Sequence, residues 1–534
     1  MKKFFIFLSF SLLIVFISCS KDDEQMEDSQ IENSLKIVEI TDVLASTANV
    51  KIAVSNTLDF IEIGICWSEG MNPRVDENLT IYSNSQGPEQ IVKLFGTSPE
   101  KKYYVRAFAK TPSGILYSEN TSFTTQGLCS GGVTDQDFYL RSQAEVNKVG
   151  TMGLCSVNLL TIFSDNVDDP IVDLRPLSGI KQVNYLSISN NNMLASLTGL
   201  ESVINVNYLG VFGNNSLANL QGLEGLRGSL NELNISGNEK LTSLSGLENI
   251  SLIVKDLDYN GSLFVTSNDS LENMEGLNGI REIFGTINIS FNRIFHSLKG
   301  LDNFRKFDGE DFSIYSNGPI VNLSGLESLE VINGNFIMYD QEEFNSLTAL
   351  SNVTEAKYFY FRNLDNLTNL NGIGNIDTAY TDELQFYLWQ NQKLTDISAF
   401  SNFSSLGVLS IIESPVTDFT PLTNITRIRY NLSIRNVDIS SLRSLSNLES
   451  AGRIFLDNLT SIENLEGLEG LRNIGMFGSS PQNGNLEIYQ CKNLTNFCAI
   501  QGLFTEGTID NDFVANSNAY NPTQQDIVDG NCSQ

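Results

Sequence analysis

The sequence has few basic residues and almost no histidine. It contains 33 lysines and arginines against 63 aspartates and glutamates, which gives a formal net charge of −30 at pH 7. Binding to nucleic acid or to an anionic membrane surface needs clustered positive charge, so both are disfavoured. The single histidine, His296, provides no imidazole set for a zinc site or a Ser-His-Asp triad, and we expect it to be a solvated corner residue.

Short catalytic and redox motifs are missing as well. There is no P-loop, no G-x-G-x-x-G sequence after a strand and no H-E-x-x-H sequence. None of the seven cysteines belongs to a C-x-x-C pair, so a zinc or thiol-redox motif is not indicated. We therefore predict a protein that is not an enzyme and holds no cofactor or metal. A carbohydrate-active enzyme with paired carboxylates stays the alternative, because acidic residues are abundant although no spacing selects a pair.

Residues 1–18 have the pattern of a secretory signal peptide. Two lysines precede an apolar run of 14 residues, Phe4 to Ile17, which is shorter than the ~20 residues that span a bilayer as a helix. The sequence Ile17-Ser18-Cys19 resembles a bacterial lipobox. This resemblance implies that Cys19 is lipidated and that acyl chains anchor the protein in the outer membrane. An ordinary signal peptide with a chance cysteine is the alternative.

Residues 19–34 are polar and are expected to form an acidic, solvated tether. The sequence SKDDE at residues 20–24 resembles the export signal of lipoproteins in Bacteroidota-type bacteria. That resemblance implies display on the outer face of the outer membrane, towards the cell exterior. The alternative is a tether without an export function.

Residues 35–126 alternate apolar and polar positions in short runs separated by Asn, Gly, Pro and Ser, which predicts strands. Pro99 stands four residues before Tyr103, and this spacing resembles the tyrosine corner of fibronectin type III domains. The resemblance implies a small antiparallel β-sandwich that acts as a spacer. Cys66 lies in one of the runs, beside Trp67, and we predict that it is a buried free thiol.

Residues 159–503 repeat the phrase Leu-x-x-Leu-x-x-Leu, preceded by a strand-like phrase such as Leu233-x-Ile235-x-x-Asn238. Fourteen such turns follow one another about 25 residues apart, and a fixed period of this length indicates a solenoid. The two apolar residues of each strand are expected to point inward. The asparagine is expected to bond backbone groups of the neighbouring turns.

The asparagine recurs in seven of the fourteen turns, and the strand phrase as a whole resembles that of leucine-rich repeats. The asparagines are Asn191, Asn214, Asn238, Asn268, Asn292, Asn317 and Asn391, and the position is lost at Gln341, Leu364 and Leu459. The recurring Leu-x-Gly-Leu resembles receptor L-domain repeats. Together these resemblances imply a mainly β fold, in which a parallel β-solenoid of about 14 turns follows the small antiparallel β-sandwich.

Both ends of the solenoid need a cover, because an apolar cross-section would otherwise be exposed. We assign residues 127–158 to the N-terminal cap and 504–534 to the C-terminal cap. In an exported protein we predict two disulfides, Cys129–Cys155 and Cys498–Cys532. Cys491 would then be unpaired at the asparagine position of the last turn. Pairing of Cys491 with Cys532 is the alternative.

Asp256-x-Asp258-x-Asn260-Gly261 resembles the start of an EF-hand calcium loop. The twelfth position is Ser267 rather than the bidentate glutamate that such a loop needs. We therefore interpret the stretch as an inserted turn, with calcium binding as the alternative.

Aromatic residues gather at the outward positions of the later strands. If the inner apolar positions point inward, the residues between and beside them point outward. In the early turns these are small and polar, as at Ser187, Asn234 and Asn288. The later strands carry Tyr315, Tyr339, Tyr358, Tyr360, Arg362, Tyr387 and Trp389. Adjacent strands about 4.8 Å apart would place them on one patch roughly 15 Å long.

These residue types dominate binding hot spots, and aromatic ring faces also suit sugars. The alternative is a stack of rings that only stabilises the sheet. The first hypothesis is a lipid-anchored surface recognition or adhesion protein that binds an extracellular protein or glycan through this face. A carbohydrate-active enzyme and a passive surface protein are the other two. The sequence does not indicate the ligand or the oligomeric state.

Overall fold

The chain, for which we describe a computed structural model, divides into two units. They are Met1–Ser130 and Gly131–Gln534. The described residues are 35–43, 47–55, 60, 62–75, 78–82, 89–95, 97, 101–112, 114–125, 132–133, 136–255, 259–377, 381–475 and 484–534. The expected signal peptide (1–18), the tether (19–34), Cys19, Cys129, Asp256 and Asp258 lie outside them. Within the described ranges, no helix is long and apolar enough to cross a membrane.

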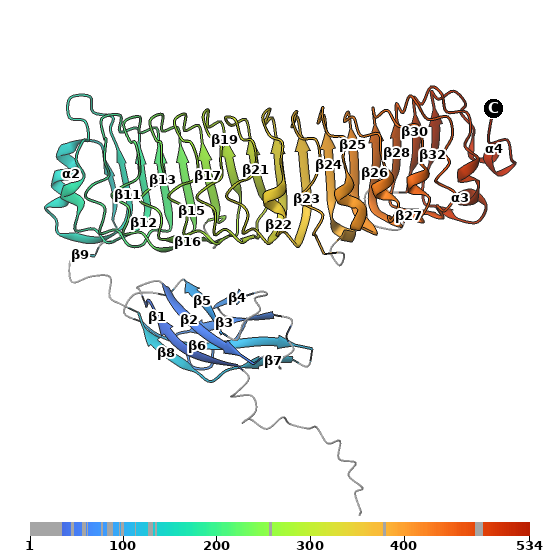
Figure 1. Ribbon diagram of the computed structural model, residues 1–534. Helices are drawn as coiled ribbons and strands as arrows, with labels where there is room; N and C mark the ends of the chain where they lie inside the picture. Colours follow the sequence, from blue (N-terminus) through green and yellow to red (C-terminus); the bar gives the residue numbers. More distant parts are fainter. Residues whose placement is uncertain are drawn as a thin grey trace, which may run out of the picture. The chain divides into compact units, whose positions relative to one another are not determined.

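The first unit contains two small antiparallel sheets (Figure 1). The first sheet has the order β1 (Leu35–Thr41), β2 (Thr47–Val54), β5 (Glu89–Phe95). The second has the order β4 (Asn78–Tyr82), β3 (Glu62–Ser68), β6 (Lys102–Thr111), β7 (Gly114–Tyr117), with β8 (Thr121–Thr124) also paired to β6. Cys66 is buried and is not part of a disulfide, as predicted.

The second unit is a ladder of parallel strands in which each turn pairs with the next (Figure 1). Its main strands are β10 (Asp137–Leu140), β11 (Leu154–Phe163), β12 (Gln182–Ser189), β13 (Tyr208–Phe212), β15 (Glu232–Ser236), β17 (Ser262–Thr266), β19 (Ile287–Ser290), β21 (Asp311–Tyr315), β22 (Val331–Tyr339), β23 (Glu355–Arg362), β24 (Gln385–Trp389), β25 (Ser405–Ile412), β26 (Arg427–Arg435), β28 (Ile454–Asp457), β30 (Leu486–Tyr489) and β32 (Phe513–Asn516).

Short strands and helical turns form the other sides of each turn. The short strands are β9 (Gly132–Val133), β14 (Gly228–Leu230), β16 (Ile250–Ile253), β18 (Glu282–Ile283), β20 (Lys306–Phe307), β27 (Ser450–Ala451), β29 (Asn473–Ile474) and β31 (Thr508–Ile509). The 3-10 turns are η1 (Arg175–Leu177), η2 (Thr348–Leu350), η3 (Thr381–Glu383), η4 (Ser398–Asn402), η5 (Thr420–Leu422), η6 (Arg443–Leu445) and η7 (Cys498–Ile500). The α-helices are α2 (Gln143–Gly150), α3 (Gln501–Thr505) and α4 (Gln524–Val528).

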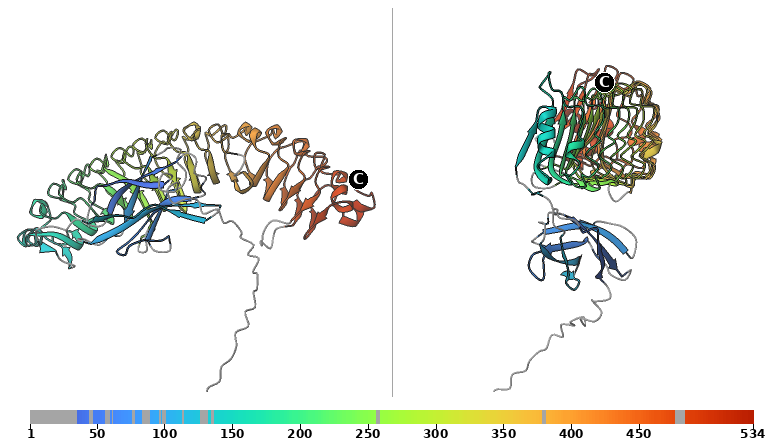
Figure 2. Two further views of the ribbon diagram at one scale, coloured as in Figure 1. Left: turned by 90° about the horizontal axis from the view of Figure 1, so that it is seen from below. Right: turned by 90° about the vertical axis from the view of Figure 1, so that its left-hand side faces the viewer.

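The mainly β fold with a parallel β-solenoid is confirmed, with about 15 turns rather than 14. Equivalent residues pair in register, so that Leu209 lies between Leu186 and Leu233. Figure 2 (left) shows the turns of this unit following one another along an arc. The additional turn comes from β32, which pairs with β30. From the sequence this stretch is predicted to belong to the C-terminal cap, because its strand no longer carries the leucine phrase.

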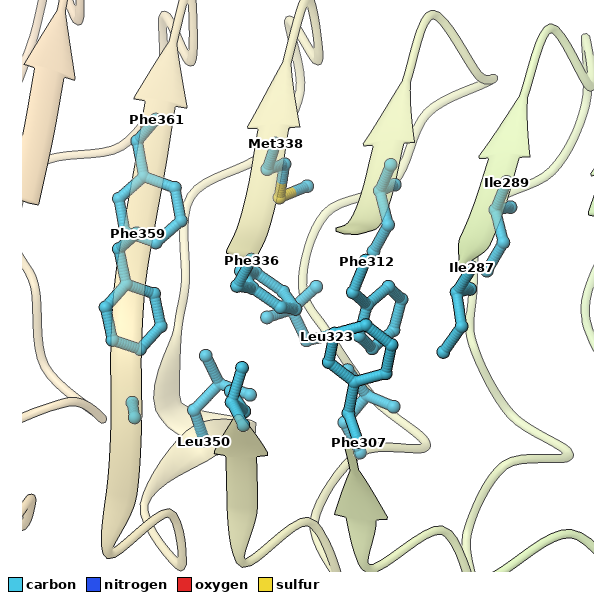
Figure 3. Packing of buried hydrophobic residues seen from close by; sticks show 14 of the residues in the cluster. Ile287, Ile289, Phe307, Phe312, Leu323, Phe336, Met338, Leu350, Phe359 and Phe361 are labelled. Carbon is cyan, nitrogen blue, oxygen red and sulfur yellow. The ribbon is translucent and has the colours of Figure 1, made fainter. Parts of the chain in front are cut away.

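The interior of the solenoid is one continuous apolar core. Leucine and isoleucine fill the first turns, whereas phenylalanines fill the middle turns. Phe312, Phe336 and Phe359 lie on successive strands with no exposed surface, and their rings contact one another (Figure 3). No single turn can bury these side chains by itself, so the free energy of burial is shared between neighbouring turns.

A ladder of buried asparagines joins the turns at the end of each main strand. The backbone N–H of Asn238 donates to Asn268 Oδ1 (3.1 Å), and Asn268 Nδ2 donates to the carbonyl of Ile235 one turn earlier (2.9 Å). The same pattern runs through Asn191, Asn214, Asn292 and Asn317. The ladder was expected to weaken at Gln341. With its side-chain oxygen turned towards the previous turn, Gln341 instead accepts from the Asn317 backbone N–H (2.9 Å).

The corner of most turns needs a glycine for two separate reasons. Gly246 has a φ of +117°, in a region that favours glycine. A Cβ atom at this position would lie 2.2 Å from the carbonyl oxygen of Leu220 in the previous turn. The backbone N–H of Gly246 donates to the Glu248 carboxylate (2.9 Å), so the acidic residue two positions later stabilises the corner. The glycine of the Leu-x-Gly-Leu phrase thus lies where the backbones of two successive turns stack directly on each other.

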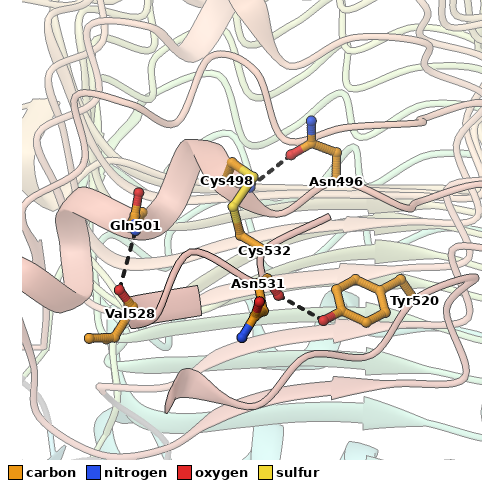
Figure 4. Close-up of a disulfide and its surroundings, with 7 residues drawn as sticks. All are labelled: Asn496, Cys498, Gln501, Tyr520, Val528, Asn531 and Cys532. Carbon is orange, nitrogen blue, oxygen red and sulfur yellow. Dashed lines mark hydrogen bonds between the residues drawn. A yellow bond between two sulfur atoms is a disulfide. The ribbon is translucent and has the colours of Figure 1, made fainter. Parts of the chain in front are cut away.

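The caps close both ends of the solenoid. At the N-terminal end α2 begins at Ser142, whose side chain accepts from the Glu145 N–H, and Cys155 is disulfide-bonded. At the C-terminal end Cys498 and Cys532 form the disulfide that the sequence predicts (Figure 4). Cys491 is free and buried, and burial raises the pKa of its thiol to about 11.

Candidate ligand-binding face

The residues that the sequence assigns to an outward patch lie on four adjacent strands, β21 to β24. Tyr315, Tyr339, Arg362 and Trp389 are paired in register across these strands and form one row. Tyr360 pairs with Tyr387 in a second row, and Tyr358 lies at the start of a third. The six aromatic rings are half-buried and Arg362 is exposed. We call these seven residues the aromatic strand face.

The rings of this face contact one another closely. Tyr315 and Tyr339 are stacked, with centroids 4.6 Å apart and planes 7° apart. Tyr360 meets Trp389 edge to face at 5.4 Å, and Tyr358 lies 5.0 Å from Tyr387. Such contacts stabilise adjacent strands. They also hold the rings in fixed positions, which lowers the entropy cost of presenting them to a ligand.

Hydrogen bonds fix the polar ends of three members of the face. Trp389 Nε1 donates to Ser410 Oγ on β25 (3.1 Å), and Tyr387 donates its hydroxyl to Gln385 Oε1 (3.3 Å). The side chain of Asn288, one strand before the face, donates to the Tyr315 hydroxyl (3.2 Å). Hydrogen bonds therefore connect the face to the neighbouring strands on both of its sides.

Phe291 borders the face and was not found from the sequence. Its side chain is 54% exposed, and its ring meets Tyr315 edge to face at 5.4 Å. Phe291 has a φ of +57°, which is uncommon for a bulky residue. It lies directly after β19, outside the strand, so the alternation of inward and outward strand positions does not predict where it points.

The expectation that the early strands present only small polar groups is wrong. Tyr185 and Tyr208 are stacked with centroids 4.1 Å apart, and Tyr259 lies 6.0 Å from Tyr208. Phe212 is also on this surface, and its ring fills the space above Gly210. The sequence YLGVF of β13 looks uniformly apolar, which hid its two outward aromatic residues. The aromatic strand face is thus not alone, because other described strands of the main sheet also carry outward aromatic residues.

The outward surface beyond the aromatic strand face is charged, and its arginines are paired. Arg427 lies 3.4 Å from the Asp382 carboxylate and Arg435 lies 3.4 Å from that of Asp457. Arg429 pairs with Glu383 and Arg453 with Glu487. The guanidinium groups of Arg435 and Arg453 also contact the ring of Phe455, at 5.0 and 4.8 Å.

The other candidate residues that the structure describes form no site of this kind. His296 is exposed, and its Nδ1 lies 3.2 Å from the Ile294 carbonyl. Where side chains are described, no three histidines, cysteines, aspartates or glutamates come together in a way that could hold a metal ion. A small hollow of about 110 Å³ lies beside α2 and is lined mainly by glycines and apolar residues.

Comparison with known proteins adds no functional assignment. The chain matches no protein-family model and no curated protein. What can be stated of its class rests on the fold, which is a parallel β-solenoid preceded by small antiparallel sheets.

Tyr358 should make the stability of the protein sensitive to alkaline pH. Burial, followed by the nearby Tyr387, Tyr360 and Asp311, raises the pKa of its phenol to about 12. In the unfolded chain a tyrosine titrates near pH ~10. The contribution of the neutral phenol to stability is therefore present below pH ~10 and is lost between pH ~10 and the folded-state value. Tyr358→Phe should lose less stability than the wild type when denaturant unfolding is compared at pH 9 and pH 11. An equal loss in both proteins would contradict the assignment.

Proposed function

We propose that this protein is a lipid-anchored bacterial surface protein that recognises an extracellular protein or glycan through the aromatic strand face. The observation that carries the proposal is the row of half-buried rings beside an exposed guanidinium on four adjacent strands. Tyrosine, tryptophan and arginine are the residues most enriched in binding hot spots. The lipobox-like sequence at Cys19 and the fibronectin type III-like module support anchoring and a spacer.

A passive role is the second candidate, and one observation favours it. The rings stack on one another, with Tyr315 and Tyr339 only 4.6 Å apart, so part of their exposed area serves the sheet itself. In that case the face would stabilise the solenoid and contact no partner. The two candidates predict different results when rings are removed.

The test is to replace Tyr387 and Trp389 by alanine in the full-length protein and to measure binding to cells, host proteins and a glycan array. If the face is a binding site, binding should fall at least about tenfold, because hot-spot truncations cost ~2 kcal/mol or more. The matched control is the double variant Phe455→Ala and Tyr489→Ala. It removes two other outward rings, whose centroids are 5.7 Å apart, against 6.1 Å for Tyr387 and Trp389.

The outcomes separate the two candidates. Loss of binding in the first variant alone supports recognition through the aromatic strand face. A similar loss of thermal stability in both variants, with binding retained, supports a passive stack. Equal loss of binding in both variants would place the contact elsewhere on the sheet.

A further inference from the structure

The positive charge of the aromatic strand face is concentrated in Arg362. Its side chain is exposed, and the guanidinium makes no hydrogen bond or ion pair with any residue that the structure describes. The carboxylate of Asp340 follows Tyr339 in the adjacent turn, but it accepts a hydrogen bond from the Asn363 side-chain amide (2.6 Å). Arg362 therefore has all of its donors available.

This availability sets Arg362 apart from the arginines on the next part of the same surface. Arg427, Arg429, Arg435 and Arg453 are each paired with a carboxylate of the chain. The sequence contains 63 acidic residues, so intramolecular partners are plentiful. An arginine that has no such partner among the described residues of an acidic chain can bind an external anion.

The surroundings of Arg362 indicate what kind of anion fits. Tyr339 lies opposite it on one adjacent strand and Trp389 on the other, and Tyr360 is two residues earlier on the same face. The planar guanidinium matches a carboxylate with two parallel hydrogen bonds. Aromatic rings within about one strand spacing, ~4.8 Å, present apolar faces to the C–H groups of sugar rings.

The net charge of the protein limits how acidic the ligand can be. At −30 the chain repels a polymer that carries a charge on every sugar. One guanidinium among neutral rings balances one carboxylate.

We propose that the aromatic strand face binds an oligosaccharide that carries a single carboxylate among neutral sugars, with Arg362 receiving the carboxylate. The proposal rests on the recognition function proposed above and names the class of ligand. The rings position the neutral sugars, and the guanidinium selects for the acidic one.

The experiment uses the full-length protein and a glycan array printed in matched pairs. Each acidic oligosaccharide, for example sialyllactose, is printed with its carboxamide derivative, and lactose and a polyuronate are included. The wild type should bind one or more singly charged glycans at least about tenfold more tightly than their amides, because charge-assisted hydrogen bonds are stronger than neutral ones by about that factor. Arg362→Gln should lose this preference.

The matched control is Arg443→Gln. It changes the net charge by the same amount at an exposed corner, where Arg443 pairs with Glu466, and it should keep the preference of the wild type. The inference is overturned if acid and amide bind equally, if Arg362→Gln keeps the preference, if the polyuronate binds best, or if no glycan on the array binds.

Failure of this inference can be told from failure of the proposed function. If Tyr387→Ala and Trp389→Ala abolish binding to a neutral glycan or a protein while Arg362→Gln does not, the face is a binding site for another class of ligand. If none of these variants alters binding to any partner, both proposals fail.

Discussion

Replacing Asn268 by alanine should destabilise the solenoid by about 3–5 kcal/mol, because it leaves two buried backbone groups without partners. Asn268 Nδ2 donates to the carbonyl of Ile235, and Asn268 Oδ1 accepts from the N–H and the side chain of Asn238. Asn268 itself has no exposed surface. Water cannot easily replace these bonds, so the cost of desolvating both groups appears in the free energy of unfolding. Chemical denaturation, followed by circular dichroism, measures it.

Asn303→Ala is the matched control for this prediction. The Asn303 side chain also donates to a backbone carbonyl of the previous turn, that of Asn278 (2.8 Å), but it is exposed. Water can satisfy the freed carbonyl, and we expect a change of no more than about 0.5–1 kcal/mol. If the two variants were equally stable, burial of the asparagine ladder would not be what makes it important.

Gly246→Ala should cost about 3–5 kcal/mol, although only one methyl group is added. The alanine would keep a φ of +117°, which L-residues rarely adopt, and its Cβ would lie 2.2 Å from the Leu220 carbonyl oxygen. Backbone strain of about 1–2 kcal/mol and overpacking of about 1–3 kcal/mol act together. Because the obstructing atom belongs to the backbone of the previous turn, relief requires the two turns to separate. Hydrogen exchange should then rise at Gly228–Leu230 and Ile250–Ile253, the short strands nearest the corner.

The control for this prediction is Gly237→Ala. Gly237 has a φ of +66°, but the nearest atom to an added Cβ is 3.7 Å away, which is an ordinary contact. Only the strain of the left-handed conformation remains, and we expect a cost of about 1–2 kcal/mol. Equal costs at Gly237 and Gly246 would show that φ alone matters and that stacking at the corner does not.

The architecture was predictable because each turn repeats the same physical requirement. A leucine in the interior of one turn must pack against an apolar residue at the same place in the next turn. An asparagine that bonds the backbone at the end of one strand is likewise needed again about 25 residues later. The last turn was not predicted as part of the solenoid because β32, with the sequence FVAN, lacks the leucines. Asn518 still occupies the ladder there, since its Oδ1 accepts from Cys491 N–H (2.9 Å) and its Nδ2 donates to the Ile488 carbonyl (2.9 Å).

The surface was less predictable than the interior. Alternation identified the seven residues of the aromatic strand face because their neighbours inside, such as Phe359 and Phe361, are clearly apolar. It failed at Phe291, which follows its strand, and at Tyr208, whose strand is apolar on both sides. The absence of an ion pair between Arg362 and any described carboxylate could not be predicted either. Whether an arginine is paired depends on carboxylates that the fold brings near from other turns.

The asparagine ladder also bears on how such a protein can change its length over evolutionary time. Asn214 and Asn238 occupy the same place in successive turns, and the hydrogen bonds of each stay within its own turn and the turns directly before and after it. A recombination event that removes or duplicates one whole turn therefore joins two equivalent cross-sections and leaves every other turn with its usual neighbours. Loss of part of a turn would instead bring an apolar side chain against the ladder. Gene rearrangements are thus expected to survive in whole-turn steps, so that the length of the solenoid can vary while its cross-section is preserved.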